Sequence, residues 1–366
     1  MLTNTATCTK STVTTAFAKS RLLATTPHAK PPIPPLRQQM RDAVLTPEDE
    51  QYLTLLEGRR DQHFTTAPLL SGFRVLALFS YEDLKGQTDK FVIGANAECA
   101  NIGGATCAER AAMAQLQLLP ARRVRKIYIV SDSPQCLTPG TLCREFLLSS
   151  PLIEDSTPFV SRATKCHPCV TTLAELYPFP SLYDRVPRSQ VLPFARKFCS
   201  RFATDLQQES EIATNATKFV KLQLSRMTPD EQEVYLKALA ATAKDARDDL
   251  FPLRYAAGTK FSDGEVRATW QHKTLEYGSS LDAVSKLIPF VEAKQNSVKP
   301  QFLMQVDQFG ILHAPFARAR AYFFEFGFLD VPVLVHDANG ELHRVPIDIL
   351  VADSPDCIAA STAAVQ

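Results

Sequence analysis

The chain has 366 residues, of which 45% are hydrophobic and 22% charged, a composition typical of a globular protein with about two domains. Its 40 basic and 39 acidic side chains leave a formal charge of +1, so the charge balance gives no reason to expect binding to nucleic acid or to a membrane surface. No apolar run approaches the roughly 18–20 residues that a membrane span requires. The nine cysteines are an odd number spread along a long chain, which favours reduced thiols, some of them on metal, over a disulfide-stapled secreted domain.

The first 41 residues differ in composition from the rest. Residues 1–41 contain no Asp or Glu, nine Thr and six Lys or Arg, and they end in a proline-rich run. A basic, hydroxyl-rich leader without acidic residues is typical of organelle transit peptides, although a disordered tail has the same composition. We therefore expect a cytoplasmic protein, or an organellar one if this leader is a transit peptide.

The segment after the leader alternates helices and strands. A helix is expected over 45–61, with Thr46 as its N-cap and Pro47 at its first position. Two strands that could form a hairpin follow, and then further elements in the same α/β style. The expected elements are strands at 71–81 and 90–98, a helix at 107–119, a strand at 126–130, a helix from 143, and short strands at 157–161 and 169–173. This order predicts one compact α/β/α layer structure.

A similar order recurs after a linker rich in proline and polar residues. The expected elements are a helix at 231–250, strands at 254–261 and 265–271, a helix at 280–294, a strand at 301–306, a helix at 314–327 and a strand at 331–337 that leads into a hairpin turn. Several landmarks of the first half recur at a nearly constant offset: Pro139, Cys143 and Arg144 match Pro315, Ala319 and Arg320 at an offset of 176, and Glu98 matches Glu276 at 178. Such an offset favours an internal duplication.

The sequence thus predicts two tandem α/β domains, each a three-layer α/β/α repeat with a mixed sheet of about five strands and flanking helices. The predicted segments are a leader at 1–41, a first domain at 42–178, a linker at 179–212, a second domain at 213–353 and a flexible tail at 354–366.

Two cysteines are expected at the starts of helices, Cys107 and Cys143. The amide dipoles exposed at a helix N-terminus stabilise a thiolate, which also suits it as a zinc ligand. Glu109, two residues after Cys107, could face a metal-bound water without binding the metal itself. That is the arrangement that a hydrolytic zinc deaminase needs.

Four motifs together resemble the cytidine deaminase family. They are Asn-x-Glu at 96–98, Cys-Ala-Glu-Arg at 107–110, Pro-x-x-x-Cys-Arg at 139–144 and a closing Leu-x-Glu-Leu-x-Pro at 173–178. The resemblance covers residues from about 45 to 178, and the second repeat extends it to about 352. It implies zinc-dependent hydrolytic deamination of cytidine or deoxycytidine to the uracil nucleoside, a reaction of pyrimidine salvage, in which a zinc-bound hydroxide attacks C4.

The resemblance also implies a role for each matching residue. Cys107 and Cys143 match zinc ligands, and Glu109 matches the carboxylate that carries protons between the water, N3 and the leaving ammonia. The residues that match substrate contacts are Phe73, Asn96, Glu98 and Ala108, and Arg110 matches the arginine that offsets thiolate charge.

The matching pair at 96–98 also favours a free nucleoside as the substrate, because a carboxylate at the ribose 3′-hydroxyl would repel a phosphate there. The two-repeat form makes a homodimer plausible, with neither nucleic acid nor a membrane as a partner.

One zinc ligand of the family pattern is missing. Gly140 stands where the family has a cysteine, whereas catalytic zinc usually has three protein ligands. Cys136, four residues upstream, is the first candidate for the third ligand. The pair Cys166 and Cys169 and the single Cys99 are further candidates, and the remaining alternative is that all of these are reduced cysteines packed as small hydrophobic residues.

The second repeat lacks the corresponding residues. Leu-Asp-Ala at 281–283 replaces Cys-Ala-Glu, and Phe316 and Ala319 occupy the two cysteine positions. His313 is nearby, but a lone histidine in a loop is more often structural. We expect this repeat to be inactive and to pack against the first.

Two other functions are consistent with the sequence. A nucleoside-binding or regulatory module would keep the pocket without the chemistry, and would bind nucleoside with neither metal nor product. A polynucleotide-editing deaminase would need a basic groove with aromatic side chains. The dense basic run at 121–126 is instead expected on a solvated loop between a helix and a strand.

Overall fold

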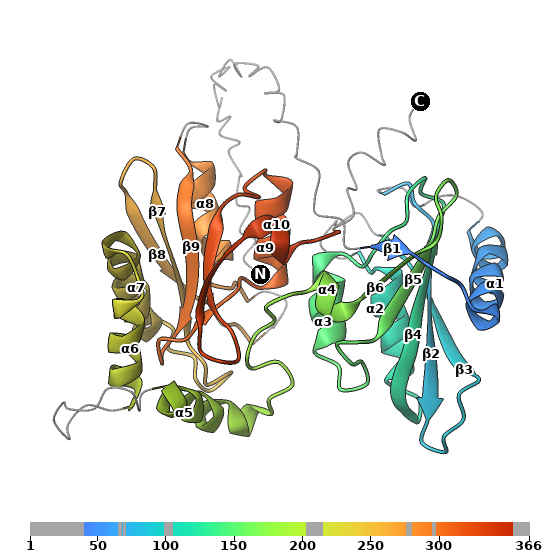
Figure 1. Ribbon diagram of the computed structural model, residues 1–366, viewed down its shortest axis with the longest axis horizontal. Coiled ribbons are helices and arrows are strands. Elements are labelled where there is room, and N and C mark those ends of the chain that lie inside the picture. Colours follow the sequence, from blue (N-terminus) through green and yellow to red (C-terminus); the bar gives the residue numbers. More distant parts are fainter. Residues whose placement is uncertain are drawn as a thin grey trace, which may run out of the picture. The chain divides into compact units, whose positions relative to one another are not determined.

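The computed structural model describes residues 40–64, 68, 71–98, 105–202, 215–275, 280–294 and 298–353, all within one compact unit. These residues form two mixed β-sheets with flanking helices, so the predicted fold class is confirmed (Figure 1). Most of the predicted leader, Cys99, Glu276 and the predicted tail lie outside the described residues. None of the described helices has both the length and the apolarity that crossing a membrane requires.

The first sheet has the strand order β1-β6-β5-β4-β2-β3. Its strands are β1 (Arg41–Asp42), β2 (Val75–Asp83), β3 (Lys90–Ala95), β4 (Ala121–Ser131), β5 (Pro158–Arg162) and β6 (Cys169–Thr172). Strands β2 and β3 form the predicted hairpin, and β4 and β5 are the parallel pair. Because parallel strands end at the same edge of a sheet, the segments that follow β4 and β5 lie at one edge.

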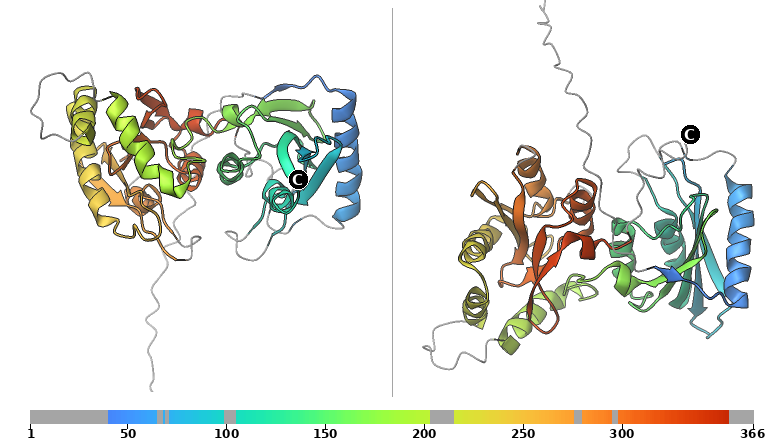
Figure 2. Two further views of the ribbon diagram at one scale, coloured as in Figure 1. Left: turned by 90° about the horizontal axis from the view of Figure 1, so that it is seen from below. Right: turned by 45° about the horizontal axis from the view of Figure 1, so that its top comes forward.

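Helices cover both faces of this sheet (Figure 2). Helix α1 (Pro47–His63) begins as predicted: Thr46 accepts a hydrogen bond from the backbone of Asp49, and the Asp49 carboxylate accepts one in return. Its buried Leu53 and Leu56 pack on one face against β2, β4 and β5. The opposite face carries the larger core, which the buried faces of α2 (Ala108–Leu116) and α3 (Thr141–Leu148) complete, with α4 (Leu173–Leu176) after β6.

The second sheet repeats this topology, with the order β12-β11-β9-β7-β8 and β10 paired to β9. Its strands are β7 (Tyr255–Phe261), β8 (Val266–Trp270), β9 (Pro300–Asp307), β10 (Leu312–His313), β11 (Pro332–His336) and β12 (Leu342–Pro346). Strands β9 and β11 are parallel, as β4 and β5 are, and the other neighbours are antiparallel in both sheets.

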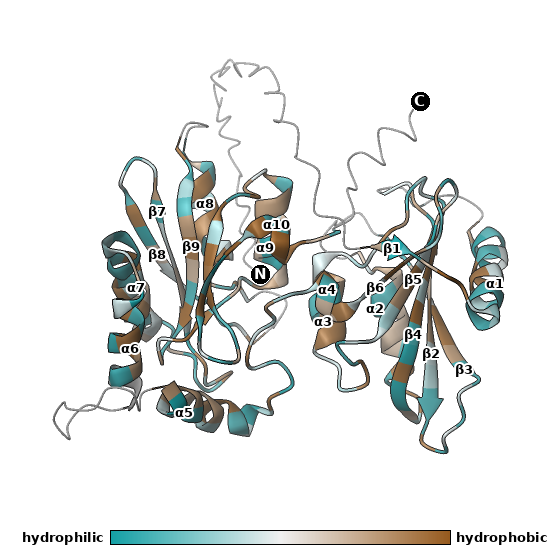
Figure 3. Cartoon of the chain, in the orientation of Figure 1, coloured by the Kyte–Doolittle hydropathy of each residue, from teal (hydrophilic) through white to brown (hydrophobic). Residues whose placement is uncertain are grey.

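The helices of the second half follow the same plan. They are α5 (Val191–Phe202), α6 (Asn215–Ser225), α7 (Pro229–Ala241), α8 (Ile288–Glu292), α9 (Ala317–Glu325) and α10 (Ile347–Leu350), with short 3₁₀ turns at Arg188–Gln190, Thr242–Lys244 and Ser285–Leu287. In Figure 3 the sheets are largely apolar, whereas α1 and α7 carry both apolar and polar residues. That distribution is expected of helices that bury one face.

The basic run at 121–126 forms the first half of β4 and is not the expected loop. Its charges are paired with neighbouring elements: Arg122 and Arg123 bind Glu82 on β2 at 2.9 and 2.8 Å, and Arg125 binds Glu48 on α1. A strand can carry these side chains because each has a partner across the sheet or on the covering helix.

Two predicted helices are shorter than expected. The helix expected at 231–250 ends at Ala241, and Asp245 turns away to pair with the buried Lys273 at 3.0 Å. The one expected at 280–294 is reduced to a 3₁₀ turn followed by α8, where Asp282 accepts a hydrogen bond from the backbone of Ser285. In the predicted linker, α5 is an ordered helix with a buried face.

Candidate metal and active site

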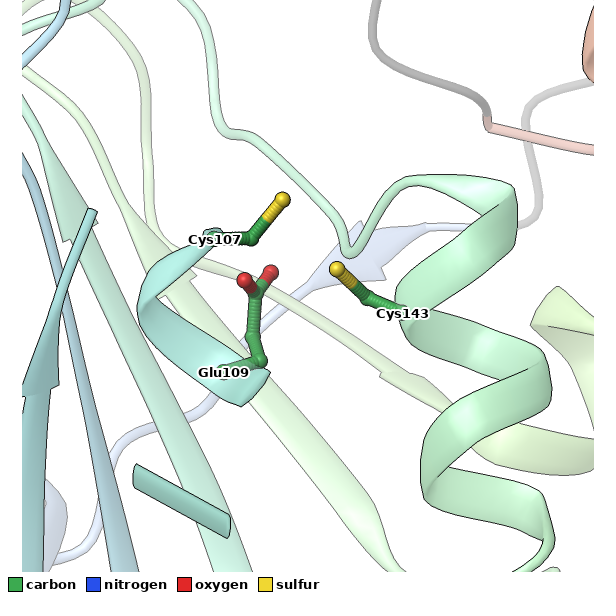
Figure 4. A group of neighbouring side chains, drawn as sticks. All are labelled: Cys107, Glu109 and Cys143. Atoms are coloured by element: carbon green, nitrogen blue, oxygen red, sulfur yellow. The ribbon is translucent and has the colours of Figure 1, made fainter. Parts of the chain in front are cut away.

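The N-termini of α2 and α3 bring Cys107, Glu109 and Cys143 together (Figure 4). Cys107 is the N-cap of α2, Glu109 lies in its first turn, and Cys143 is the third residue of α3. Two sulfurs and a carboxylate oxygen from these residues all lie within 4.8 Å of one another. Residues that are 36 positions apart in the sequence thus form one cluster of potential metal ligands.

The position of α2 depends on a glycine in the neighbouring strand. A Cβ at Gly94 of β3 would lie 2.2 Å from the backbone oxygen of Ala108 and 2.3 Å from the backbone nitrogen of Ala112. Only glycine therefore lets the first turn of α2 pack directly on the strand. Just before the helix, Ala97 and Thr106 exchange two backbone hydrogen bonds, which fixes the chain that enters Cys107.

The start of α3 is held by a buried arginine, Arg144, next to Cys143. Its guanidinium donates to the backbone oxygens of Pro139 and Leu176 at 2.7 and 2.6 Å, and to the hydroxyl of Thr138 at 2.9 Å. Burial lowers the pKa of Arg144 to about 10. In the sequence Arg144 is only a landmark of the repeat. Its recurrence as Arg320, again five residues after a proline, is the signal that could have indicated a structural role.

The two thiols of the cluster shift each other's pKa in opposite directions. A hydrogen bond with Cys143, together with the positive charge of Arg110, lowers the pKa of Cys107 to about 6. The same hydrogen bond and burial raise the pKa of Cys143. Arg110 donates to the backbone oxygen of Ala105 at 2.7 Å and lies 3.9 Å from the Cys107 sulfur. The pair therefore carries negative charge near neutral pH, next to two helix N-termini that stabilise it.

Glu109 is buried beside these sulfurs. Burial and the negative charge of Cys107 raise the pKa of Glu109 to about 7. A carboxyl group with such a pKa can both take up and release a proton near neutral pH.

Asn96 and Glu98, predicted to bind substrate, are held by backbone groups at the start of β2. The amide of Asn96 accepts from the backbone of Val75 at 2.9 Å and donates to the backbone oxygen of Phe73 at 3.0 Å, which leaves one N–H for another partner. The Glu98 carboxylate accepts from the backbone of Ser71 at 3.1 Å, and its charge acts on Cys107.

The other two residues predicted to contact substrate are buried. Phe73 lies in the interior just before β2, and Ala108 begins α2 with its side chain in the core. The structure thus places all four of these residues around the start of α2 and β2.

The structure places Cys136, the first candidate for the third ligand, in a different group of thiols, and its part in binding a metal stays a prediction. Its sulfur lies 3.0 Å from the sulfur of Cys166 and 3.3 Å from the backbone oxygen of Ser161. The loop after β4 packs against the segment that follows β5, and this neighbour could not be read from spacing along the chain. Cys166 and Cys169 belong to that second group of thiols.

Gly140, the N-cap of α3, has open space where a side chain would lie. Its φ and ψ of −64° and 161° suit any residue, and a Cβ there would meet no atom within 4 Å. Two thiols and a carboxylate are a donor set that zinc accepts, so Cys107, Cys143 and Glu109 fit a zinc ion.

The matching place in the second half is filled with apolar side chains. Phe316 is the N-cap of α9, as Gly140 is of α3, and Ala283 and Ala319 are fully buried. His313 is buried and hydrogen-bonded to Asp307 at 3.1 Å, a structural role as expected. Among the described residues, the other group that could hold a metal is Asp337 and Glu341, in the turn between β11 and β12, with His343 on β12.

No family model and no curated protein matches this chain. Among solved structures, cytidine deaminase from Burkholderia pseudomallei is 22% identical over 37% of this chain and 99% of its own, with a TM-score of 0.31. The cytidine deaminase from Mycobacterium tuberculosis is 19% identical over 36% of this chain and 98% of its own, with a TM-score of 0.28. That from Mycobacterium leprae is 17% identical over 32% of this chain and 94% of its own, with a TM-score of 0.27.

Proposed function

We propose that the first half of the chain is a zinc-dependent hydrolase that deaminates cytidine or deoxycytidine to uridine or deoxyuridine. The observation that carries this proposal is the cluster of Cys107, Glu109 and Cys143 at two helix N-termini. The four motifs described above give the substrate class, and the cluster supplies the groups that the reaction needs.

Cys107 and Cys143 would hold the zinc ion, which when bound acidifies a water molecule and makes it a nucleophile at neutral pH. Glu109 takes a proton from the attacking water and delivers it to N3 of the base, where it stays in the product. It then takes the second proton, from the hydroxyl group added at C4, and delivers it to the amino group, which departs as ammonia. The Glu109 pKa of about 7 suits both directions of transfer, because a general acid–base group works best with a pKa near the working pH.

Asn96 and Glu98 would bind the ribose. Asn96 keeps one N–H for a hydroxyl, and Glu98 presents a carboxylate that accepts a hydrogen bond. A phosphate on the ribose 3′-oxygen would meet the negative charge of Glu98. This charge favours a nucleoside with a free 3′-hydroxyl.

We propose that the second half is an inactive copy that supports the first. The shared sheet topology and the apolar side chains at the matching site support this role. Two such halves per chain also make a homodimer the expected assembly.

A second candidate function rests on Gly140. With two cysteines and an open third position, the first half could bind nucleosides without turning them over. Zinc content and turnover separate the two functions.

The test is to purify the full chain and to measure bound zinc and conversion of cytidine to uridine for the wild type, Glu109→Gln and Cys143→Ala. We expect zinc in the wild type, its loss in Cys143→Ala, and retained zinc with turnover lower by about 10²–10⁴-fold in Glu109→Gln, the usual contribution of a general acid–base group. Cys199→Ala is the matched control, because Cys199 is a buried thiol that contacts Phe309 in the second half.

Each other outcome has a defined meaning. Loss of zinc in Glu109→Gln would make Glu109 a ligand and remove it as the proton carrier. Nucleoside binding with neither zinc nor product in the wild type would replace the enzyme with the binding module.

A further inference from the structure

Three cysteines form a second thiol group, separate from the metal cluster. Cys136 lies in the loop after β4, and Cys166 and Cys169 flank the turn between β5 and β6. The sulfurs of Cys136 and Cys166 are 3.0 Å apart, and the backbone N–H of Cys136 donates to the Cys166 sulfur at 3.1 Å. All three are free thiols.

The third sulfur converges on the same turn. The thiols of Cys136 and Cys169 both donate to the backbone oxygen of His167, at 3.3 and 3.4 Å. One carbonyl group thus holds two of the thiols, while the third lies against Cys136.

The two segments that carry these thiols are already joined by hydrogen bonds. Thr164 donates to the backbone oxygen of Ser133 from both its N–H and its hydroxyl, at 3.1 and 3.0 Å, and the hydroxyl of Ser161 donates to the backbone oxygen of Leu137 at 2.7 Å. A bond between the sulfurs needs an approach of only about 1 Å, because an ordinary disulfide is about 2 Å long.

The exposure of the thiols differs in a way that suits a two-step exchange. Cys136 is buried, with 8% of its surface exposed, whereas Cys166 and Cys169 are partly exposed. A reagent from solution therefore reaches the turn first, and Cys136 is positioned behind it. Burial also raises the pKa of the Cys136 thiol. Because the thiolate is the nucleophile, Cys136 is then expected to react after a more exposed thiol.

Three neighbouring thiols could also bind a metal ion. Among the described residues, two groups bring three metal-binding atoms within 4.8 Å of one another: Cys107, Glu109 and Cys143, and Asp337, Glu341 and His343. The sulfurs of Cys136, Cys166 and Cys169 do not form such a group. The close pair with a third thiol beside it favours disulfide chemistry.

We propose that Cys136 and Cys166 form a reversible disulfide through exchange with a small-molecule disulfide such as oxidised glutathione. The Cys166 thiolate attacks one sulfur of the reagent, forms a mixed disulfide and releases one glutathione thiolate. Cys136 then attacks the Cys166 sulfur, gives up its proton to solvent and releases the second glutathione. The protein loses two electrons and two protons, and the reagent is reduced to two thiols.

The bond has a consequence for the site, since the loop of Cys136 continues directly into Gly140 and Cys143. Oxidation ties this loop to the turn after β5 and restricts the start of α3. The inference does not depend on the proposed deaminase activity.

The test is to incubate the reduced full-length protein with oxidised glutathione, block the remaining thiols by alkylation and map disulfides by peptide mass spectrometry. We expect a peptide pair joined through Cys136 and Cys166, lighter by two hydrogen atoms, that reduced glutathione separates again. Cys166→Ser should lose this cross-link, whereas Cys169→Ser and the control Cys199→Ser should keep it.

Mapping of the wild type makes the test independent of how the variants fold. A mixed disulfide that persists on Cys166 would overturn the proposal, as would a bond formed only to Cys169 or only between Cys107 and Cys143. A bound metal that protects Cys136, Cys166 and Cys169 from oxidation and is lost in Cys136→Ser would replace the disulfide with a second metal site.

Discussion

Gly140 occupies the position at which a third zinc-binding cysteine is expected. It caps α3 beside Cys143 in a conformation that any residue adopts, and the space that its side chain would take is open. A cysteine at this position therefore meets no steric obstacle, and its sulfur would add a third thiol at the same helix N-terminus.

We expect Gly140→Cys to raise zinc affinity more than about 10-fold, because even the loss of an outer partner of a metal ligand changes affinity by about 10–100-fold. Because the proposed chemistry needs the bound metal, turnover of cytidine should rise with zinc content. Competition with a chromogenic chelator measures the affinity, and uridine formation measures the turnover.

Leu142→Cys is the matched control for this prediction. It places a thiol in the same turn of α3, on a side chain that is exposed to solvent. Equal zinc affinity in both variants, or no gain in Gly140→Cys, would show that the open position does not face the metal.

At the level of elements, the sequence predicted what local patterns encode. The cap of α1 at Thr46 and Pro47 and the β2–β3 hairpin are local features, and both were predicted. The placement of Cys136 was not predictable, because it depends on which loop the segment after β4 meets in space. The strand at 121–126 was missed because its arginines look solvated until their partners on β2 and α1 are known.

Gly94 illustrates how one element positions another. We expect Gly94→Ala to destabilise the protein by about 1–3 kcal/mol, the usual cost of overpacking, since the new Cβ would meet the backbone of α2 at Ala108 and Ala112. Because α2 carries Cys107, zinc affinity should fall as well. Urea unfolding and zinc titration measure the two effects.

The control for this change is another glycine in a regular element. Gly58 lies in α1, where an added Cβ would meet no atom within 4 Å, so Gly58→Ala should stabilise the protein by about 1 kcal/mol through helix propensity. A Gly94→Ala variant with wild-type stability and zinc binding would show that α2 can shift without cost.

At the scale of the whole molecule, each half anchors a site helix of the other. Arg144 of the first half donates to the backbone oxygen of Ala352 at 2.6 Å, and Arg320 of the second half donates to that of Pro178 at 2.9 Å. Glu145 on α3 accepts a hydrogen bond from the backbone of Ala317 at the start of α9. The stability of the second half therefore bears on the site in the first.

That stability should depend on pH through His336, a buried residue at the end of β11. Its Nδ1 accepts a hydrogen bond from the backbone of Leu312 at 2.8 Å, and its Nε2 lies 3.0 Å from the Gln223 side-chain oxygen. This arrangement requires the neutral ring, because a protonated Nδ1 cannot accept. Burial, together with the neighbouring His313, lowers the pKa of His336 to about 3.

Between pH 6.5 and about 3 the unfolded chain binds a proton at His336 that the folded chain does not, so the free energy of unfolding falls as the pH is lowered. Within this range the slope that one such group contributes is about 1.4 kcal/mol per pH unit, and the full stabilisation is reached above pH 6.5, where the slope vanishes. Urea unfolding at several pH values measures the slope.

His336→Asn keeps an acceptor for Leu312 without a titrating ring, so it should flatten the slope by that amount. The control is His343→Asn, at a half-exposed histidine paired with Asp337, which should change the slope little. An unchanged slope in His336→Asn would mean that other groups govern acid unfolding, and that the contacts around β11 tolerate a charged ring.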